Sequence, residues 1–518
     1  AVERLCQAYQ NREKICIHGD FDLEGTSGLA LLLKGLECLG FTQLSFYQPK
    51  RLTEGYGLHA HAMEGFKEKG VTLVLTVDVG ITGHEAVDRA RELGLDVIVT
   101  DHHLPVETLP SALAILNPNK GSCRSGLGHL CGTGVAFFLL LGIRREFRQR
   151  NWLEIDFNPK KLLDCFAIGT LTDLVPLVGE NRVLVRHGLI ELARTERPGL
   201  QLLLEELGLA GRSLSSQEVA IRFAPKLNAL SRMELGIFPL DLYLVETREE
   251  AQSLIKEVLS NNDKRLKLQA AAEEEAFLQA IARQQQGFVW VWSDQFHQGV
   301  VGLVATRLAQ TLQVPAFVGS KNKETGLITG SARAPNKGYA HVLRALEFSA
   351  GCLEKFGGHA SAAGFGVNQA RADDLNQSLS QFFESQLENK TQVIEQLYDE
   401  ECRLEEINPL FMSWLAQLEP FGEAWEPIVL RVTNLEVKSI RELRGGHLKI
   451  EVKDQVSDHR MDALWFSPSS QNEFVQKFEF NKEKLWGETV EILAEPQWNY
   501  FAGRKSTQLL IRDFKLRA

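Results

Sequence analysis

Several features that would place this chain in a familiar class are missing from its 518 residues. It has no run of 18 apolar residues, which is the length that a membrane-spanning helix needs. Its eight cysteines are scattered, and none forms a pair with zinc-ligand spacing. The formal net charge of −10 argues against a uniformly basic surface for nucleic acid, although a local basic groove can coexist with it.

These absences indicate the setting in which the chain works. Most cysteines lie in apolar segments, as reduced and buried thiols do, so we expect a cytoplasmic protein that does not contact a membrane. The chain begins at Ala1 without an initiator methionine, which leaves open the removal of an N-terminal segment, including one for organelle import. Its length exceeds what one core can fill and predicts three or four domains.

Acidic residues follow three short apolar runs near the start of the chain. The runs and the residues that follow them are residues 14–19 with Asp20 and Asp22, residues 71–77 with Asp78, and residues 95–100 with Asp101, His102 and His103. Apolar, β-branched runs separated by helical stretches are typical of parallel strands covered on both faces, so we expect an α/β fold. Ligands of such sheets bind beyond the carboxyl ends of the strands.

The residue types after these runs predict a metal site. Asp20 and Asp22 are two apart, so on an extended chain they point to the same side, and residues 25–27 are expected to open the next helix. Asp173 follows another apolar run, in a segment (residues 169–176) that we expect to be a loop. Carboxylates and imidazole together suit Mn²⁺ or Mg²⁺ better than a soft metal, and we expect two ions.

The remainder of the chain indicates further domains. Residues 1–245 are expected to alternate strand and helix, and residues 247–286, which lack proline and glycine, to form one long connecting helix. A second α/β unit is expected from residue 287, and alternating strands after residue 400 predict a small β-barrel. The expected boundaries are 1–245, 246–286, 287–392 and 400–518.

Read in order, the motifs resemble the DHH phosphoesterase superfamily and, within it, the RecJ family of single-strand-specific exonucleases. The resemblance covers nearly the whole chain and rests on Gly19-Asp-Phe-Asp22, residues 49–58 (PKRLTEGYGL), residues 76–81 (TVDVGI), Asp101-His-His103, residues 169–176 and the distant Gly357-Gly-His359. The C-terminal β-domain separates RecJ from shorter relatives. The resemblance implies a DHH domain, a connecting helix, a DHHA1-type substrate-binding domain and an OB-like nucleic-acid-binding barrel.

The resemblance also implies roles for individual residues. The metal ligands would be Asp20, Asp22, Asp78, His102 and Asp173, with Asp78 bridging two ions. Asp78, His102 and His103 would be catalytic, with His103 near the scissile phosphate. Two ions can activate a shared water and stabilise the leaving oxygen, which gives phosphodiester hydrolysis. The substrate-binding residues would be Asn228, Arg232, His297, Ser331, Arg333, Gly357, Gly358 and His359.

Three residues depart from the family pattern. Glu24 stands where the first motif usually carries a third aspartate, and Lys226 and Ser231 interrupt a stretch that usually reads Arg-x-Asn-Ala-x-Gly-Arg. Simpler roles compete with ligand binding at some positions: His297 could cap a helix near residue 300, and Gly357 and Gly358 could form a tight turn. We expect His18 and His84 to be structural.

The barrel carries basic and aromatic residues that could track phosphates and stack on bases. They are Arg441, Arg444, Lys449, Arg504 and Lys505, with Trp465, Phe466, Trp498, Tyr500 and Phe501. Because most aromatic residues of a small barrel pack in its core, we expect only one or two to stack on bases.

The leading functional interpretation is a metal-dependent exonuclease that degrades single-stranded DNA in recombination and repair, with the 5′-to-3′ direction implied by the resemblance alone. Its expected partners are single-stranded DNA, a helicase and a single-strand-binding protein, and we expect a monomer. Two alternatives stay open: a phosphodiesterase for short RNA oligonucleotides or cyclic dinucleotides, and a catalytically silent DNA-binding scaffold.

Overall fold

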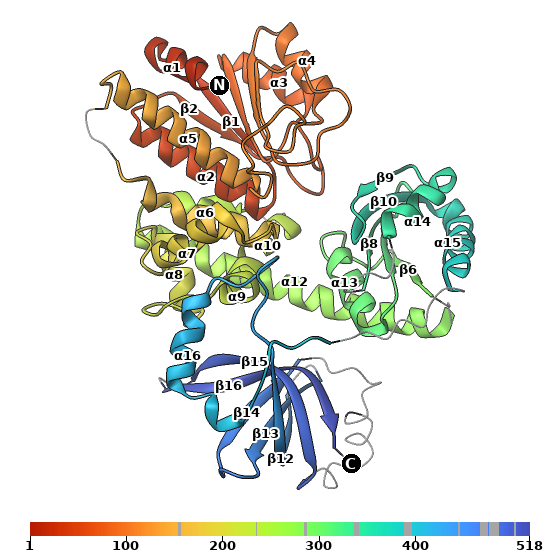
Figure 1. The fold of residues 1–518 in the computed structure, drawn as a ribbon. Helices are drawn as coiled ribbons and strands as arrows, with labels where there is room; N and C mark the ends of the chain where they lie inside the picture. Colours follow the sequence, from red (N-terminus) through yellow and green to blue (C-terminus); the bar gives the residue numbers. More distant parts are fainter. Residues whose placement is uncertain are drawn as a thin grey trace. The chain divides into compact units, whose positions relative to one another are not determined.

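The chain folds into two compact units. The computed structural model describes residues 1–153, 157–234, 236–283, 287–335, 341–387, 396–443, 446–466, 475, 486–501 and 504–517. The first unit comprises Ala1–Ala270 with Pro420–Trp425, and the second comprises Ala271–Glu419 with Glu426–Ala518. Each unit has hydrophobic cores of its own. Figure 1 labels the helices and strands of both units.

A parallel sheet organises the first half of unit 1. Its strands run in the order β2-β1-β3-β4-β5 and are β1 (Ile15–Gly19), β2 (Leu44–Tyr47), β3 (Leu73–Val77), β4 (Asp96–Thr100) and β5 (Ala114–Leu116). Every residue of β1 and β3 is buried because helices cover both faces of the sheet. The helices are α1 (Val2–Asn11), α2 (Leu23–Cys38) and α5 (Gly132–Gln149) in one core, with α3 (Ala60–Glu68) and α4 (His84–Glu92) in the other. The predicted parallel α/β architecture is confirmed.

The second half of unit 1 is helical, which corrects the prediction that residues 1–245 alternate strand and helix. Among the described residues from Gly132 to the connecting helix, no strand is present. The elements after α5 are η1 (Pro159–Leu162), α6 (Leu163–Asp173), α7 (Gly179–Ala193), α8 (Pro198–Glu206), α9 (Ser216–Glu218), η2 (Val219–Phe223), α10 (Ala224–Met233) and α11 (Pro239–Leu244). A short apolar run does not distinguish a buried helix from a buried strand, and this ambiguity caused the error.

Two local predictions in unit 1 are also wrong. Residues 169–173 are not a loop but the last turns of α6, which ends where Leu174 adopts a left-handed conformation (φ 59°). Helix α2 begins at Leu23 rather than at Gly25, because the Asp22 side chain accepts a hydrogen bond from the Gly25 amide and caps the helix.

The long helix predicted for residues 247–286 is confirmed over Arg248–Arg283 as α12, and residues 284–286 lie outside the described residues. It contributes Ala251, Ile255 and Val258 to the core of unit 1, and Ala272 and Ala276 to a core of unit 2. The helix is therefore shared by both units.

The α/β part of unit 2 contains a mixed sheet in the order β6-β7-β8-β10-β9, in which only β6 and β7 are parallel. The strands are β6 (Val289–Ser293), β7 (Ala316–Lys321), β8 (Leu327–Arg333), β9 (Lys355–Gly358) and β10 (Ala362–Asn368). The helices are α13 (Val301–Leu312), α14 (Val342–Phe348) and α15 (Ala372–Leu387), with η3 (Ala350–Cys352) and η4 (Gln369–Arg371). Helices α14 and α15 pack on one face of the sheet, whereas α12 and α13 pack on the other.

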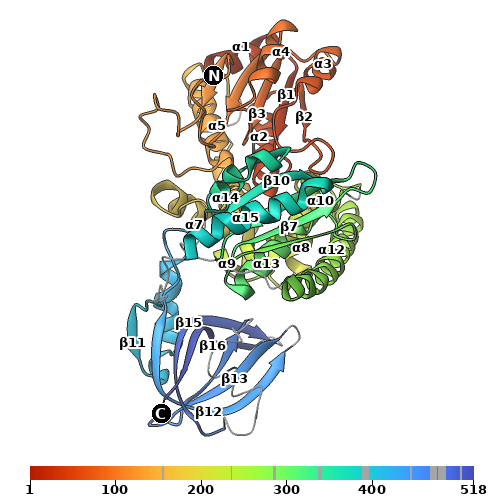
Figure 2. The same ribbon diagram turned by 90° about the vertical axis from the view of Figure 1, so that its right-hand side faces the viewer.

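The C-terminal part of unit 2 is a β-barrel, as predicted (Figure 2). Its strands are β11 (Glu400–Cys402), β12 (Leu430–Leu443), β13 (His447–Asp454), β14 (Arg460–Trp465), β15 (Thr489–Phe501) and β16 (Arg504–Leu516). Pairing of β12 with β15 closes the sheet into a barrel, and the short β11 is an edge strand paired with β12 alone. The short elements η5 (Leu404–Glu406), α16 (Pro409–Leu415) and η6 (Ala416–Leu418) precede β12.

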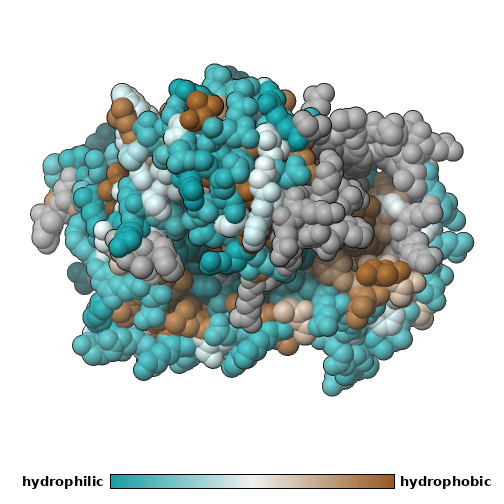
Figure 3. All heavy atoms as spheres, turned by 90° about the horizontal axis from the view of Figure 1, so that it is seen from below, coloured by the Kyte–Doolittle hydropathy of each residue, from teal (hydrophilic) through white to brown (hydrophobic). Residues whose placement is uncertain are grey.

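Hydrophilic residues cover most of the face drawn in Figure 3, with hydrophobic residues scattered among them. Of the helices in the described part of the chain, none combines the length and the apolar character needed to span a membrane.

Candidate metal centre

The sheet order of unit 1 brings the predicted ligands to one edge. Strands β1, β3 and β4 are neighbours and parallel, so their carboxyl ends meet at the same edge of the sheet. Asp20 follows β1, Asp78 follows β3 and the Asp101-His102-His103 segment follows β4. Helix α6, rather than a fourth strand, supplies Asp173 as its last residue.

The side chains converge in three overlapping groups whose potential ligand atoms lie within 4.8 Å of one another. The groups are Asp20 with Asp22 and Asp78, Asp78 with His102 and His103, and Glu24 with His102 and Asp173. Asp78 and His102 each belong to two groups. The arrangement therefore provides adjacent sets of oxygen and nitrogen atoms that could serve as metal ligands.

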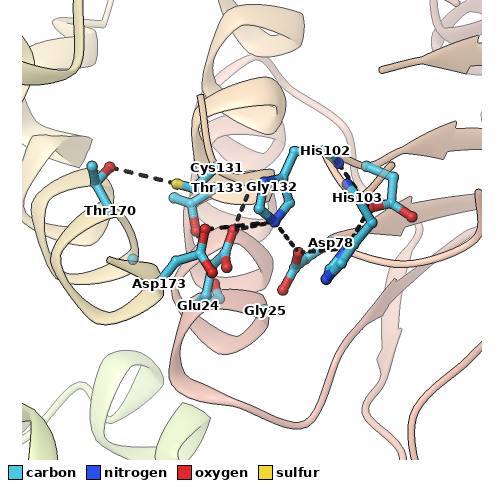
Figure 4. A network of polar contacts seen from close by, with 12 residues as sticks. Glu24, Gly25, Asp78, His102, His103, Cys131, Gly132, Thr133, Thr170 and Asp173 are labelled. Atoms are coloured by element: carbon cyan, nitrogen blue, oxygen red, sulfur yellow. Dashed lines mark hydrogen bonds and ion pairs between the residues drawn. The ribbon is translucent and has the colours of Figure 1, made fainter. Parts of the chain in front are cut away.

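His102 lies at the centre of the groups (Figure 4). Its Nε2 is 3.3 Å from Asp78 Oδ1, 3.6 Å from Asp173 Oδ2 and 3.7 Å from Glu24 Oε1. The backbone around it is fixed because Asn119 donates a hydrogen bond to the carbonyl of His102, and Asn117 donates one to the carbonyl of His103. Residues after β5 thus hold the histidine pair in place.

Asp78 has an unusual backbone. Its φ of 62° lies in the left-handed region, which a non-glycine residue rarely adopts. Its amide is held by the Thr100 carbonyl at 3.0 Å, and a Cβ on Gly132 would lie 2.6 Å from the Asp78 Cβ. Glycine at the first position of α5 therefore allows the helix N-terminus to approach this carboxylate closely.

Asp101 holds His103 instead of facing the cluster. Its carboxylate accepts hydrogen bonds from the amides of Ile81, His102 and His103 and from His103 Nδ1 at 2.8 Å. Burial would lower the pKa of His103, but the hydrogen bond to Asp101 and the Asp101 charge outweigh it, so the pKa is raised. Nδ1 of His103 therefore lies between Asp101 and the metal cluster, 3.7 Å from Asp78 Oδ1.

The clustered carboxylates repel one another, which disfavours their ionised forms. Burial, followed by the charges of neighbouring carboxylates, raises the pKa values of Asp20, Glu24 and Asp78 well above the usual range. Burial also raises the pKa of Asp173 to about 6. Within the described residues, the buried oxygens Asp20 Oδ1, Asp78 Oδ1 and Asp173 Oδ2 accept no hydrogen bond, although His102 Nε2 lies 3.3 Å from Asp78 Oδ1 and 3.6 Å from Asp173 Oδ2. Buried, repelling, acceptor-only oxygens fit a hard divalent cation.

Glu24 was missing from the predicted ligand set, although the structure places it in the cluster. It is buried in the first turn of α2, where its carboxylate accepts a hydrogen bond from the Gly132 amide and lies beside His102 and Asp173. The departure from the family pattern was noticed in the sequence, and the acidic residue at the start of a helix was the available signal.

Tyr56 is a second residue that the sequence analysis did not single out. Its hydroxyl lies 3.2 Å from His103 Nδ1 and 3.4 Å from the Asp78 carbonyl oxygen. Tyr56 belongs to the motif PKRLTEGYGL, to which no role was assigned from the sequence.

Asn228 and Arg232 lie on α10, which packs against α2. Asn228 is half-buried and its carbonyl accepts a hydrogen bond from Ser231. Glu234, the residue after α10, accepts a hydrogen bond from the amide of Leu52, which belongs to the segment PKRLTEGYGL (residues 49–58). The two residues are therefore in unit 1 with the carboxylates, and a contact with substrate stays a prediction.

Three of the predicted substrate-binding residues of unit 2, Ser331, Arg333 and Gly357, share one face of its sheet. Ser331 pairs with Gly364, and Gly364 pairs with Gly357, so these three positions form a row across β8, β10 and β9. Arg333 lies two residues from Ser331 on the same face and donates a hydrogen bond to its hydroxyl at 2.6 Å. A Cβ on Gly357 would meet no atom within 4 Å, whereas Ser331 and Arg333, two strands away, lie against Gly302 of α13.

Local structure accounts for three other predicted residues. Gly358 has a φ of 140°, and a Cβ there would lie 2.5 Å from the Ala362 carbonyl, so the hairpin itself requires glycine. His359 is exposed in this hairpin, where its amide bonds to the Ala362 carbonyl. His297 Nδ1 accepts a hydrogen bond from the Gly299 amide in the turn before α13, but it does not cap the helix, because the N-cap residue is Val300 and no side chain caps it.

The other histidines considered lie apart from the three ligand groups. His18 is fully buried between Tyr47 and Phe66, and burial lowers its pKa to about 3, so it is neutral. His84 is the first residue of α4.

The barrel separates its aromatic residues into core and surface. Trp465 is buried and stacks on Phe514, whereas Phe466 and Tyr500 are exposed. The Lys505 ammonium lies 3.8 Å from the Trp498 ring centroid and 5.6 Å from that of Tyr500. The hairpin of β15 and β16 thus places Lys505 between the exposed Tyr500 and Trp498, which is half-buried against the barrel core. Arg444 and the Phe501 side chain lie outside the described residues.

Comparison with known proteins assigns the three regions. The model of the DHH family, N-terminal domain, matches residues 14–170, that of the DHHA1 domain matches residues 284–385, and that of the RecJ OB domain matches residues 398–513. The chain is thus of the DHH phosphoesterase class, with a DHHA1 domain and a C-terminal OB barrel.

Similarity over the full length of the chain identifies the family within this class. The chain is 32% identical to the single-stranded-DNA-specific exonuclease RecJ of Bacillus subtilis, over 99% of this chain and 62% of that protein. It is 30% identical to RecJ of Salmonella typhimurium, over 99% of this chain and 89% of that protein. The crystal structure of Thermus thermophilus RecJ with Mn²⁺ superposes with a TM-score of 0.79 at 27% identity, covering 99% of this chain and 70% of that one. The chain belongs to the RecJ family of single-stranded-DNA-specific exonucleases.

Proposed function

We propose that this chain is an exonuclease that hydrolyses phosphodiester bonds of single-stranded DNA with Mn²⁺ or Mg²⁺ as cofactor. One observation carries the proposal: buried carboxylates and His102 converge at the carboxyl edge of the parallel sheet with oxygens that no hydrogen bond satisfies. Membership of the RecJ family and the resemblance to a Mn²⁺-bound relative support the same activity.

In this proposal the ions are held by Asp20, Asp22, Asp78, His102 and Asp173, together with Glu24. A pair of divalent ions supplies an activated water and stabilises the charge that develops on the phosphate and the leaving oxygen. His103, held by Asp101 through Nδ1, is proposed to direct Nε2 to a phosphate oxygen, and Asp101 raises its pKa despite its burial.

We assign substrate binding to residues of both units. Arg333 offers a planar fork of donors that matches phosphate oxygens, which a lysine lacks. Gly357, which lies in one row with Ser331 and Gly364, has no side chain and leaves room for a nucleic-acid backbone. Asn228, Arg232, His297, Ser331, Gly358 and His359 complete the proposed set, and the barrel is proposed to bind the strand further from the cut.

The finer parts of the proposal rest on the family resemblance. They are the 5′-to-3′ direction, the work in recombination and repair, the cytoplasmic location, the monomeric state and cooperation with a helicase and a single-strand-binding protein. The domain limits 1–245, 246–286, 287–392 and 400–518 are likewise proposed.

Digestion of end-labelled DNA tests the proposal. A 5′-labelled and a 3′-labelled single strand, each beside its duplex, are incubated with Mn²⁺ or with EDTA. We compare the natural chain with Asp78→Ala and with Asp88→Ala, a matched change of an exposed aspartate on α4. We expect Mn²⁺-dependent loss of single strands from the 5′ end, abolished only by Asp78→Ala.

The two alternative functions give different results in the same assay. Rapid cleavage of dinucleotides with slow cleavage of long strands would favour the phosphodiesterase for short substrates. Binding of single strands without cleavage under any metal would favour the silent scaffold. The complete set of carboxylates argues against the scaffold, and the barrel argues against the short-substrate enzyme.

A further inference from the structure

A segment from the C-terminal half of the sequence is built into unit 1. Residues Pro420–Trp425, here called the strap, belong to unit 1, whereas the residues on both sides of them in the sequence belong to unit 2. The family model of the RecJ OB domain includes this segment, since it matches residues 398–513. The proposed function gives the strap no role.

The strap is a tight turn with a fixed shape. The amide of Gly422 bonds to the carbonyl of Trp425 at 2.9 Å, and the amide of Trp425 bonds back to the carbonyl of Gly422 at 3.1 Å. Between them Ala424 adopts a φ of 58°, which is unfavourable for a residue with a Cβ. A strained position of this kind persists only where surrounding contacts hold it.

Those contacts are made with the segment that follows Asp173. The amide of Leu177 donates a hydrogen bond to the Glu423 carbonyl at 2.8 Å, and a Cβ on Gly422 would lie 2.8 Å from Leu177 Cδ1. The guanidinium of Arg182, in the first turn of α7, lies 3.8 Å from the centroid of the Trp425 ring.

The loop between α6 and α7 (residues 174–178) is short and depends on these contacts. It begins at Leu174, directly after Asp173, and it has only one buried apolar anchor of its own, Leu177. The buried Asn181 donates hydrogen bonds to the carbonyls of Pro176 and His129, which joins the loop to the start of α5. The strap therefore braces the chain four residues beyond a carboxylate of the metal cluster.

We propose that the strap is a positioning element for the metal centre: Trp425 and Glu423 hold the loop of residues 174–178, and the loop fixes the orientation of Asp173. The inference rests on the proposed function, because it treats Asp173 as a metal ligand. Trp425 and Arg182 act through Asp173 and do not themselves touch substrate. A segment that the OB-domain model includes thereby sets the affinity of the DHH domain for its cofactor.

Titration of the metal-free full chain with Mn²⁺, followed by calorimetry, tests the proposal directly. Trp425→Ala is compared with Trp425→Phe, which keeps a ring for Arg182, and with Trp414→Ala, a control in which an exposed tryptophan of α16 is removed. Loss of a partner bonded directly to a metal ligand typically weakens binding roughly 10- to 100-fold, so for this more distant brace we expect about 3- to 10-fold in Trp425→Ala. Trp425→Phe and Trp414→Ala should bind Mn²⁺ as the natural chain does.

Activity on single-stranded DNA gives a second measurement. If Asp173 is misplaced but present, excess Mn²⁺ should restore the kcat of Trp425→Ala, whereas a general loss of folding would not respond to the metal. Should Trp425→Ala fail to fold, Arg182→Ala replaces it, with Arg186→Ala as its control one turn further along α7.

Each outcome decides one of the two proposals. Unchanged Mn²⁺ affinity in both Trp425→Ala and Arg182→Ala overturns the positioning role, even if the natural chain degrades DNA. Weakened affinity with no DNA cleavage by the natural chain supports the positioning role and overturns the exonuclease. Absence of Mn²⁺ binding by the natural chain overturns the positioning role.

Discussion

Replacing Asp173 by asparagine should stabilise the metal-free protein. In the folded chain the pKa of Asp173 is raised from 3.8 to about 6 by burial, so the folded state binds this proton more tightly than the unfolded state does. The sign follows from linkage: the stability linked to this group is present below pH 3.8 and is lost as the pH rises to about 6. Asparagine is uncharged at every pH, so the Asp173→Asn variant should not lose this stability as the pH rises.

The magnitude follows from the two pKa values. At about 1.4 kcal/mol for each pKa unit, the rise from 3.8 to about 6 corresponds to about 3 kcal/mol of lost stability above pH 7. About half of this, or about 1.5 kcal/mol, has already been lost at pH 5. For a folding unit of this size, about 3 kcal/mol corresponds to roughly 6 to 10 °C in Tm.

Thermal unfolding in EDTA at pH 5 and pH 8 measures the effect. We expect Asp173→Asn to unfold at a higher temperature than the natural chain, with the larger difference at pH 8. Mn²⁺ should raise the Tm of the natural chain and raise that of Asp173→Asn much less. Asp88→Asn, an exposed change on α4, should shift Tm little at either pH. Equal Tm values for the natural chain and Asp173→Asn in EDTA at pH 8 would refute the argument.

Three further changes test other parts of the site. Asp78→Ala should remove detectable Mn²⁺ binding in calorimetry and abolish cleavage, since Asp78 belongs to two of the three ligand groups. Mn²⁺ binding near the affinity of the natural chain would argue against a shared ligand. Glu24→Asp should weaken the hydrogen bond to Gly132 and lower Mn²⁺ affinity about threefold to tenfold, and an increase would show that the longer side chain is a handicap. Arg333→Lys should raise KM for single strands about tenfold with little change in kcat, which steady-state kinetics can separate.

The sequence predicted the sheet and the barrel better than the helical region. Residues 73–77 and 96–100 are apolar runs of strand length followed by aspartate, and the parallel sheet confirms them. The run at residues 162–168 looks the same, yet it is part of a buried helix, because α6 packs against both α2 and α7. Burial on all sides removes the 3.6-residue periodicity that would distinguish a helix.

Site residues that directly follow a strand could be predicted from the sequence. Residues whose position depends on contacts with distant parts of the chain were harder to predict. Asp20, Asp78 and His102 follow neighbouring strands, and their convergence follows from the strand order. The role of Asp101 is different, because its carboxylate bonds to three amides and His103, which only the fold of that turn reveals. Glu24 was overlooked as a ligand because its position depends on the N-terminus of α5, more than 100 residues away.

Glycines at helix crossings explain how so many carboxylates are held together before an ion binds. A Cβ on Gly28 of α2 would lie 2.5 Å from Val77, and one on Gly169 of α6 would clash with Thr133 of α5. With Gly132 against Asp78, the three helices approach one another and β3 more closely than larger residues would allow. This packing opposes the mutual repulsion of the carboxylates and the left-handed strain at Asp78. The packing of the surrounding core therefore keeps the repelling carboxylates close together. A bound cation removes this repulsion, which adds to the free energy of cation binding.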